Sequence, residues 1–401
     1  MMIINISDVE YNMNYIERRL NIESLIKRKS LFLVGPRLVG KSTYVNQQLK
    51  SLFALSWSLL DGKLRMQVQA NPSLLREEVI GRSLSDCAIF IDEIQKCPSL
   101  LDEIHYLIES RNIRFLLTGS SLYKLRKGGV NLLGGRASIR KMGVLSYIEL
   151  KSSFNPSLKQ IMKSGMLPSI FLSENSEEDL SSYIDAYLTE EIAAEGAVRN
   201  LSNFSRFLTT AALTNTQILN YVNVARDAQL PPQTVKNWYQ ILFDTLLAFE
   251  VPAFLKTEKR KAFSTGKFYL FDVGIARLLK NAPVPNEESI EFGQLFEQFI
   301  AIEIKTFLEC CSPRSKLSYW RSISGFEVDF VIDQKLAIEV KATKVIHQKH
   351  LKGLQALREE NLFSRYIVVS LEERVRNVDG IEIWPWSYFL EKLWDNEKPL
   401  L

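Results

Sequence analysis

The sequence predicts a multidomain α/β protein with a parallel sheet in its first part, a helical middle part and a second strand-rich part at its end. Three observations lead to this prediction. Residues 35–42 match the phosphate-binding pattern G-x-x-x-x-G-K-S directly after an apolar run. Residues 216–247 have the pattern of a helix-turn-helix. Two apolar segments that carry acids, 327–332 and 336–341, predict a hairpin.

Composition limits the class of protein. The 401 residues are 46% hydrophobic and 24% charged, which is ordinary for a globular chain and enough for about two to four domains. The net charge of +4 is too small to indicate a nucleic-acid partner by itself. The four cysteines and three histidines show no metal-ligand spacing. No run stays both uncharged and predominantly apolar for the roughly 18 residues of a membrane span, since the uncharged stretch 207–225 is rich in threonine and asparagine. We therefore expect a reducing, cytoplasmic location and no membrane segment.

The first predicted elements surround the phosphate-binding loop. Residues 15–29 predict a charged amphipathic helix that clasps the core, and residues 31–34 predict the first strand. Loop glycines let backbone N–H groups turn towards phosphates, and the following helix directs the positive end of its dipole at them. Lys41 would reach the β- and γ-phosphates and Ser42 would bind Mg²⁺, so the loop predicts bound ATP or GTP. The predicted nucleotide-binding residues are Gly35, Pro36, Arg37, Leu38, Val39, Gly40, Lys41, Ser42, Thr43 and Ser120.

An apolar strand that ends in acid, residues 88–93, supplies the second half of such a site. Asp92 would hold Mg²⁺, and Glu93 would orient or deprotonate the attacking water, which favours hydrolysis over binding alone. A third strand, 114–118, runs into Gly-Ser-Ser at residues 119–121. Hydroxyl groups at this point could sense the γ-phosphate, or the three residues could form an ordinary turn.

Short apolar runs alternate with helical patterns, such as residues 100–108, as far as about residue 150, which predicts a parallel sheet. The glycine-rich stretch 128–140 predicts a flexible loop that carries Arg136 and Arg140. An arginine on such a loop could reach a phosphate in the same or a neighbouring subunit, or it could be a solvated surface residue. A contact from a neighbouring subunit would require at least a dimer, so a homo-oligomer is a candidate state.

The middle part is predicted to be helical. We expect a Ser- and Asn-rich linker over residues 152–176 and a new helical part that begins near residues 183–192. The helix-turn-helix pattern consists of short helices at 218–222 and 224–228 and a longer one at 234–239. Its third helix, with a basic stretch that could form a wing, offers contacts to DNA, although such three-helix folds also serve as protein-docking or lid modules. The candidate DNA-binding residues are Thr234, Lys236, Asn237, Lys259, Arg260 and Lys261.

The last part carries a second set of acids. Strand alternation places Glu339 and Lys341 on one face, and a hairpin register can bring Asp329 beside them. Two carboxylates and a lysine around one point could bind a divalent cation, activate water and stabilise a pentavalent phosphate. A preceding helix adds Glu297 as a third acid, and Glu303 on the same helix is the alternative for that role. The acids of the hairpin lie within apolar strands, where an unpaired charge is costly to bury, and this favours a functional site. The candidate metal ligands are Ser42, Asp92, Glu297, Asp329 and Glu339, and the candidate catalytic residues are Lys41, Glu93, Arg136, Glu339 and Lys341.

Several short motifs follow one another along the chain, at residues 35–37, 40–42, 92–95, 117–121, 128–133, 135–136, 234–238, 271–274, 327–330 and 339–343. With these motifs the whole chain resembles bacterial and archaeal AAA-type ATPases that join an N-terminal ATPase domain to a C-terminal domain of unknown function. The resemblance implies an AAA-type P-loop ATPase domain at 1–152, a helical lid and linker at 153–200, a winged-helix-like domain at 201–265 and a PD-(D/E)xK restriction-endonuclease-like domain at 266–401. In that last group the motif acids would correspond to Glu297, Asp329 and Glu339, with Lys341 as the lysine.

Two functions remain open from the sequence. In the first, Mg²⁺-dependent ATP hydrolysis is coupled to DNA binding or processing, with or without cleavage by the last domain. In the second, the protein is a nucleotide-dependent switch that binds other proteins, and the nuclease-like part is a non-catalytic scaffold. A kinase or GTPase is disfavoured because no guanine-selecting Asn-Lys-x-Asp motif is present. The expected cofactors are ATP and Mg²⁺, and DNA is a candidate partner.

Overall fold

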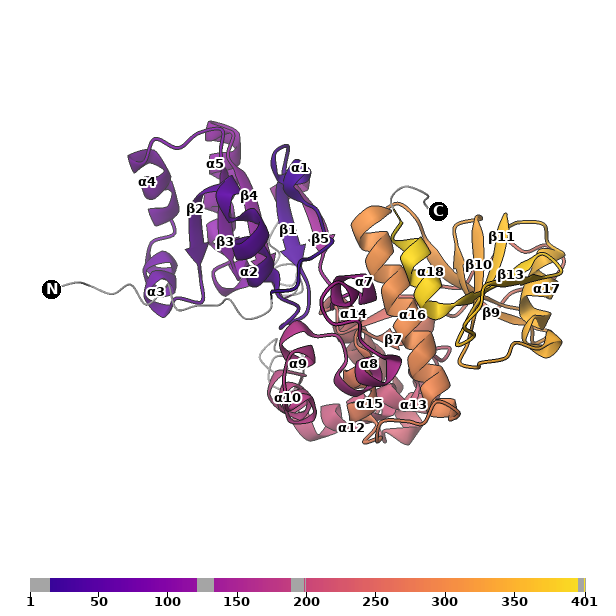
Figure 1. Cartoon of the computed structure of the whole chain (residues 1–401). Helices are drawn as coiled ribbons and strands as arrows, with labels where there is room; N and C mark the ends of the chain where they lie inside the picture. The colour runs from indigo at the N-terminus through magenta and orange to yellow at the C-terminus, as the bar shows by residue number, and fades with distance from the viewer. Residues whose placement is uncertain (1–14, 121–132, 189–197, 199, 396–399, 401) are drawn as a thin grey trace.

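The computed structural model describes residues 15–120, 133–188, 198, 200–395 and 400. Along the chain it forms an N-terminal parallel sheet, a helical middle part and a C-terminal mixed sheet, and the two large sheets lie at opposite ends with the middle helices between them (Figure 1). Ser121, the motif residues 128–132 and the predicted helical residues 189–192 lie outside the described residues.

The N-terminal sheet has five strands in the order β2-β3-β4-β1-β5, and each neighbouring pair is parallel. Its strands are β1 (Ser30–Val34), β2 (Phe53–Ser58), β3 (Ala88–Asp92), β4 (Arg114–Gly119) and β5 (Ala137–Lys141). Helices α3 (Gly62–Ala70), α4 (Leu74–Gly81) and α5 (Leu100–Arg111) supply buried side chains to one face of the sheet, and α2 (Lys41–Tyr44) supplies them to the other. Both faces are therefore covered, which explains why β1 and β3 are apolar runs and confirms the predicted parallel sheet.

The predicted amphipathic helix at residues 15–29 is wrong for most of its length. Only α1 (Glu23–Ile26) is helical, and residues 15–22 form an extended strap in which exposed and buried side chains alternate. Ile16, Arg18, Leu20 and Ile22 are the buried ones. A period of two residues is typical of an extended chain, and the charge of Arg18 hid this period in the sequence. The strap nevertheless packs against the core, as the predicted clasp would.

The middle part contains short helices and one two-stranded antiparallel sheet. Its elements are α7 (Tyr147–Lys151), α8 (Leu158–Ser164), α9 (Pro168–Phe171), α10 (Ser176–Ser182), the π-helix η6 (Tyr183–Leu188), α12 (Leu201–Leu213), α13 (Tyr221–Asp227), α14 (Pro232–Asp244), β6 (Ala248–Val251), β7 (Lys267–Leu270) and α15 (Val273–Leu279). The predicted linker at 152–176 is wrong, because α8 and α9 occupy it. The helix pair α13–α14 is present as predicted, but residues 218–222 do not form their own helix, because Ile218 pairs with Lys267 and the N–H of Leu219 donates to Gly266.

The C-terminal sheet has six strands in the order β12-β13-β11-β10-β9-β8. Its elements are α16 (Ile290–Cys311), β8 (Leu317–Arg321), β9 (Glu327–Ile332), β10 (Leu336–Lys341), α17 (Lys352–Arg358), β11 (Arg365–Ser370), β12 (Arg376–Val378), β13 (Ile381–Pro385) and α18 (Trp386–Leu393). The predicted hairpin is confirmed, since β9 and β10 are antiparallel with Ile332 opposite Leu336. Because β10 pairs with β11 in parallel, the sheet is mixed. Helices α16 and α18 cover one face and α17 covers the other.

One cluster of buried apolar side chains continues from the N-terminal strap through the middle part to the face of the C-terminal sheet that α16 covers. A division between residues 265 and 266 would separate β6 from β7, which pair over four positions. The three parts therefore share packing as well as sequence order. No helix in the described ranges is long and apolar enough to cross a membrane.

Candidate functional site

The glycine-framed loop connects the end of β1 to the start of α2, as predicted. A Cβ atom at position 35 would lie 2.1 Å from the carbonyl oxygen of Met142, so only glycine fits there. Gly40 has φ +87°, a left-handed conformation that glycine adopts without strain. These two constraints explain why the pattern requires glycine at both ends of the loop.

Lys41 is buried, and its side chain folds back into its own loop. Its Nζ donates hydrogen bonds to the carbonyl oxygens of Gly35 at 2.8 Å and Pro36 at 2.9 Å. The ammonium group is thus enclosed by the loop at the start of α2, where the N–H groups of the first helical turn are also directed. The positive charge of Lys41 and several backbone N–H donors therefore lie close together at the start of α2.

Ser42 and Asp92 meet at the end of β3. The Ser42 hydroxyl lies 2.9 Å from both carboxylate oxygens of Asp92, and the hydroxyl of Thr118 on β4 donates to the same carboxylate. Asp92 therefore faces the loop across the edge of the sheet. A hydroxyl and a carboxylate in contact are the oxygen ligands that Mg²⁺ prefers, so these residues fit the predicted ion.

Glu93 continues the chain just beyond this contact. It has φ +60°, and its N–H donates to the hydroxyl of Thr118 at 3.1 Å. The side-chain amide of Gln95 donates to the Glu93 carboxylate and, at 3.3 Å, to the hydroxyl of Ser120. No role was predicted for Gln95 or Thr118, although Gln95 comes shortly after β3 and Thr118 lies near the end of β4, its parallel neighbour.

Neither predicted loop arginine lies at this site. Arg136 precedes β5, whose first residue pairs with Ser30 at the beginning of β1, whereas the phosphate-binding loop follows the end of β1. Its guanidinium forms an ion pair with Glu109 on α5. Arg140 lies within β5, opposite Leu33, and not on a flexible loop as predicted. A phosphate contact by Arg136 within its own chain is therefore disfavoured, and a contact with a neighbouring subunit stays a prediction.

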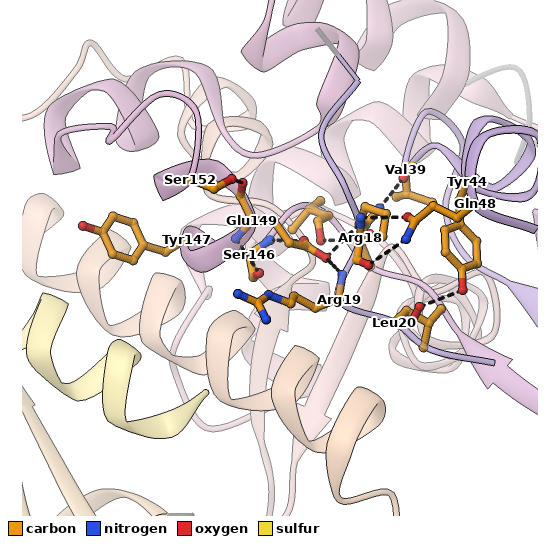
Figure 2. A network of polar contacts seen from close by, with 12 residues as sticks. Arg18, Arg19, Leu20, Val39, Tyr44, Gln48, Ser146, Tyr147, Glu149 and Ser152 are labelled. Atoms are coloured by element: carbon orange, nitrogen blue, oxygen red, sulfur yellow. Dashed lines mark hydrogen bonds and ion pairs between the residues drawn. The ribbon is translucent and has the colours of Figure 1, made fainter. Parts of the chain in front are cut away.

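A buried arginine that the sequence reasoning missed holds the loop from behind. Figure 2 shows Arg18 of the strap between Val39 of the loop and Glu149 of α7. Its Nη1 donates to the Val39 carbonyl at 2.7 Å, and its Nη2 donates to the carbonyls of Gly143 and Val144, each at 3.0 Å. Its Nε lies 3.1 Å from Glu149 Oε1. No local pattern of the sequence indicates this contact, because Glu149 lies 131 positions from Arg18.

Glu149 and Glu303 extend this network towards the C-terminal part. Glu149 accepts hydrogen bonds from the N–H groups of Arg19 at 2.6 Å and Ser146 at 2.8 Å (Figure 2). Glu303 on α16 accepts from the N–H of Tyr147 at 2.6 Å, and its burial raises its pKa to about 8. Glu303 therefore bonds α16 to α7, which leaves Glu297 as the helical acid near the other predicted acids.

The C-terminal acids do come together. Lys341 Nζ lies 2.5 Å from Glu339 Oε1 and 3.9 Å from Asp329 Oδ2, as the hairpin register predicts. The N–H of Val340 donates to Asp329 Oδ2 at 2.8 Å. Burial opposes ionisation of Asp329, but the ammonium groups of Lys341 and Lys267 outweigh it and lower the pKa of this carboxyl group. For Glu339 the effect of burial dominates and raises the pKa to about 8.

A second lysine, which the sequence reasoning missed, lies among these acids. Lys267, the first residue of β7, places Nζ 2.6 Å from Glu327, 3.1 Å from Glu297 and 3.5 Å from Asp329. Tyr269 donates to the same Glu297 oxygen at 2.7 Å. Although burial disfavours its charge, Glu297 holds the pKa of Lys267 well above its usual value. The sequence signal was a lysine at the start of an apolar run.

The residues present do not fit a three-carboxylate metal site. Glu297 and Asp329 share the ammonium group of Lys267, and Glu339 pairs with Lys341. In the part of the chain that the structure describes, no group of three or more histidine, cysteine, aspartate or glutamate side chains is arranged to hold a metal ion. The predicted metal ligands Glu297, Asp329 and Glu339 are thus neighbours, but each carboxylate is paired with the ammonium group of a lysine.

The predicted DNA-binding residues divide into two groups. Lys236 and Asn237 are exposed on α14, next to the half-buried Thr234. The basic stretch is instead attached to the C-terminal part, where Arg260 donates to the Ala356 carbonyl at 3.0 Å and pairs with Glu359 at 2.7 Å. Lys259 and Arg260 are consequently committed to contacts with the segment at the end of α17, while the side chain of Lys261 is exposed.

A parallel sheet with a glycine-framed loop after β1 and an acid at the end of β3 defines a P-loop nucleotide-binding class. Comparison with protein families identifies its kind. Residues 27–151 match an AAA domain, residues 155–285 match a domain of unknown function (DUF8612), and residues 292–389 match another domain of unknown function (DUF4143). The matches thus run from an AAA domain in the N-terminal part to a domain of unknown function in the C-terminal part, which confirms the resemblance that the motifs predict.

A comparison with curated proteins finds no match. Among solved structures, the chain is similar to the Aeropyrum pernix Orc1 protein, determined in complex with DNA, at 10% sequence identity. That similarity covers 66% of this chain and 93% of the Orc1 chain, with a TM-score of 0.26. A superposition this loose carries no conclusion about the present chain.

Proposed function

We propose that this protein binds ATP with Mg²⁺, hydrolyses it at the P-loop and couples hydrolysis to DNA binding or processing. The observation that carries the ATPase proposal is the pair of 2.9 Å contacts between the Ser42 hydroxyl and Asp92, beside the enclosed Lys41. An ion-binding pair and a phosphate-binding lysine on one loop suit a nucleoside triphosphate better than a free anion. The lack of a guanine-selecting motif favours ATP over GTP.

The residues have distinct roles in this proposal. Lys41 would exchange its two carbonyl partners for phosphate oxygens, while the N–H groups at the start of α2 would bind the remaining phosphate charge. Ser42 and Asp92 would hold Mg²⁺, which when bound neutralises negative charge on the phosphates. Glu93 would orient the attacking water and accept its proton, and Gln95 would fix the orientation of that carboxylate.

The surroundings of the loop support communication with the rest of the chain. Tyr183 of η6 donates to the Arg37 carbonyl at 3.5 Å, and Pro168 of α9 lies 3.7 Å from the Cβ position of Gly40. Arg18 also contacts the loop, at the carbonyl of Val39. A change in the loop on phosphate binding would therefore act on helices of the middle part, which also carries the exposed face of α14 that we propose for DNA.

A second candidate function is a nucleotide-dependent protein-interaction switch in which the nuclease-like part is a scaffold. One observation favours it: Lys267 neutralises acids that a metal-dependent nuclease would need. The net charge of +4 is also modest for a protein that grips DNA.

The test is ATP turnover with Mg²⁺, alone and with single-stranded, double-stranded or branched DNA, followed by a cleavage gel on the same samples. We expect Lys41→Ala and Glu93→Gln to lose at least about 100-fold in turnover, because each removes a group that contacts the reacting phosphates or water. Lys27→Ala is the matched control, since its ion pair with Glu23 is largely exposed. Wild-type turnover in Lys41→Ala would refute the ATPase proposal. Stimulation by DNA that Lys236→Ala weakens would support the DNA proposal, and the absence of any DNA effect would favour the switch.

A further inference from the structure

A buried cluster of ion pairs lies between β7 and the C-terminal sheet. We define the acid cluster as Glu297, Glu327, Asp329 and Glu339 with the two lysines Lys267 and Lys341. Three of its acids come from the C-terminal hairpin and one from α16, but Lys267 comes from the small sheet of the middle part. The cluster is therefore formed by two parts of the chain.

We propose that the ammonium group of Lys267 permanently takes the position between Glu297 and Asp329 that a divalent cation would need, so that the acid cluster is an internal ion-pair junction and not a metal site. Lys267 Nζ lies 3.1 Å from Glu297 Oε1 and 3.5 Å from Asp329 Oδ1. Mg²⁺ requires oxygen ligands at about 2 Å in an octahedral arrangement. An ion that contacted these two oxygens would occupy the region of Nζ, where two cations would repel each other.

Further contacts occupy oxygens of the acid cluster. Glu297 Oε1 additionally accepts from Tyr269 at 2.7 Å, and Asp329 Oδ2 accepts from the N–H of Val340 at 2.8 Å. Glu339 Oε1 is 2.5 Å from Lys341. Glu339 Oε2 is buried and has no hydrogen-bond partner among the described residues, but one free oxygen does not make an ion site.

Lys267 cannot withdraw from the cluster without disrupting the core. It is 3% exposed, and the following residues Phe268, Tyr269 and Leu270 are at most 2% exposed. Its backbone pairs with Val251 on one side and bridges to Ile218 on the other. A buried ammonium group without carboxylate partners would also be strongly unfavourable, because an unpaired charge is costly to bury. Strand pairing thus fixes the backbone of Lys267, and the carboxylates fix its side chain.

This inference does not depend on ATP hydrolysis, and it gives the C-terminal part a structural role. The acid cluster joins the small sheet of the middle part to the six-stranded sheet by buried charge pairs. A movement of the middle part would therefore be transmitted to the C-terminal sheet, as the switch function requires.

The experiment titrates Mn²⁺ against the full chain without nucleotide and follows the loss of the free-ion EPR signal. We expect the wild type and Lys267→Arg to bind no Mn²⁺ that depends on Asp329, since both keep a cation at this position. Lys267→Met removes the cation but keeps the length of the side chain, and we expect it to bind one Mn²⁺ at least about tenfold more tightly than the wild type. The double variant Lys267→Met/Asp329→Asn should lose that site. Mn²⁺ should also raise the melting temperature of Lys267→Met and not that of Lys267→Arg.

Two results would overturn the inference. The first is Mn²⁺ binding by the wild type that Asp329→Asn abolishes. The second is a folded Lys267→Met variant that gains no Mn²⁺ affinity, because the ammonium group would then not be what excludes the ion. If Lys267→Met does not fold, the comparison of the wild type with Asp329→Asn decides alone, because it uses no change at position 267. Loss of ATP turnover in any variant would bear on the ATPase proposal and not on this one.

Discussion

Replacing Arg18 by methionine removes the guanidinium that joins the phosphate-binding loop to α7 while it keeps most of the apolar length of the side chain. The side chain of Glu149, its ion-pair partner, is 2% exposed. Breaking a buried ion pair by removal of one partner costs about 3–5 kcal/mol. Glu149 keeps its hydrogen bonds from the N–H groups of Arg19 and Ser146. We therefore expect Arg18→Met to lower the free energy of unfolding by about 3 kcal/mol, near the lower end of this range. The carbonyl of Val39 also loses its donor, so we expect weaker ATP binding.

The assay is urea unfolding followed by circular dichroism for Arg18→Met, Glu149→Gln and the double variant. Once Arg18 is absent, neutralising Glu149 should cost less, so the double variant should be more stable than additivity predicts by about 1–3 kcal/mol. Arg28→Met is the control, because Arg28 is exposed, and it should change stability by no more than about 0.5 kcal/mol. The reasoning would be refuted if Arg18→Met cost less than about 1 kcal/mol or if the two single changes were additive.

Two further predictions concern buried groups near the helices of the middle part. Gly165→Ala should destabilise the protein by about 2–5 kcal/mol, because Gly165 has φ +68° and a Cβ there would lie 2.1 Å from Asp272 Oδ1. In the same urea assay Gly81→Ala should be nearly neutral, since nothing lies within 4 Å of its Cβ position, and equal effects of the two changes would contradict the account. Burial raises the pKa of Glu303 from 4.5 to about 8, so its folded state favours the protonated form. The stability that this preference contributes is fully present below pH 4.5 and is lost as the pH rises through about 8, so Glu303→Gln should make the unfolding free energy vary less over that interval. A Glu303→Gln variant with the wild-type pH profile would show that another group is responsible.

Parts of this fold could be predicted because local sequence determines them. Strands β1 and β3 are apolar runs buried on both faces, and the hairpin of β9 and β10 shows its turn at Asp333, which has φ +52°. The loop glycines, Ser42 and Asp92 follow such strands directly, so their positions at one edge of a parallel sheet follow from the topology.

Other parts could not be predicted because they depend on contacts between distant segments. Arg18 interrupts the apolar period of the strap, and only Glu149, 131 positions later, explains its burial. Lys267 is 62 positions from Asp329, so no local pattern shows that it neutralises that acid. Arg136 precedes an edge strand, and only the register of β5 against β1 shows that it lies far along the sheet from the loop.

The central claim is that Ser42 and Asp92 together hold the Mg²⁺ of a bound ATP. Its most direct test is the affinity for a fluorescent ATP analogue, measured with Mg²⁺ and with EDTA, in the wild type and in Asp92→Asn. The account predicts that Mg²⁺ tightens binding to the wild type and has at most a small effect on Asp92→Asn. Equal tightening of both proteins by Mg²⁺ would contradict it.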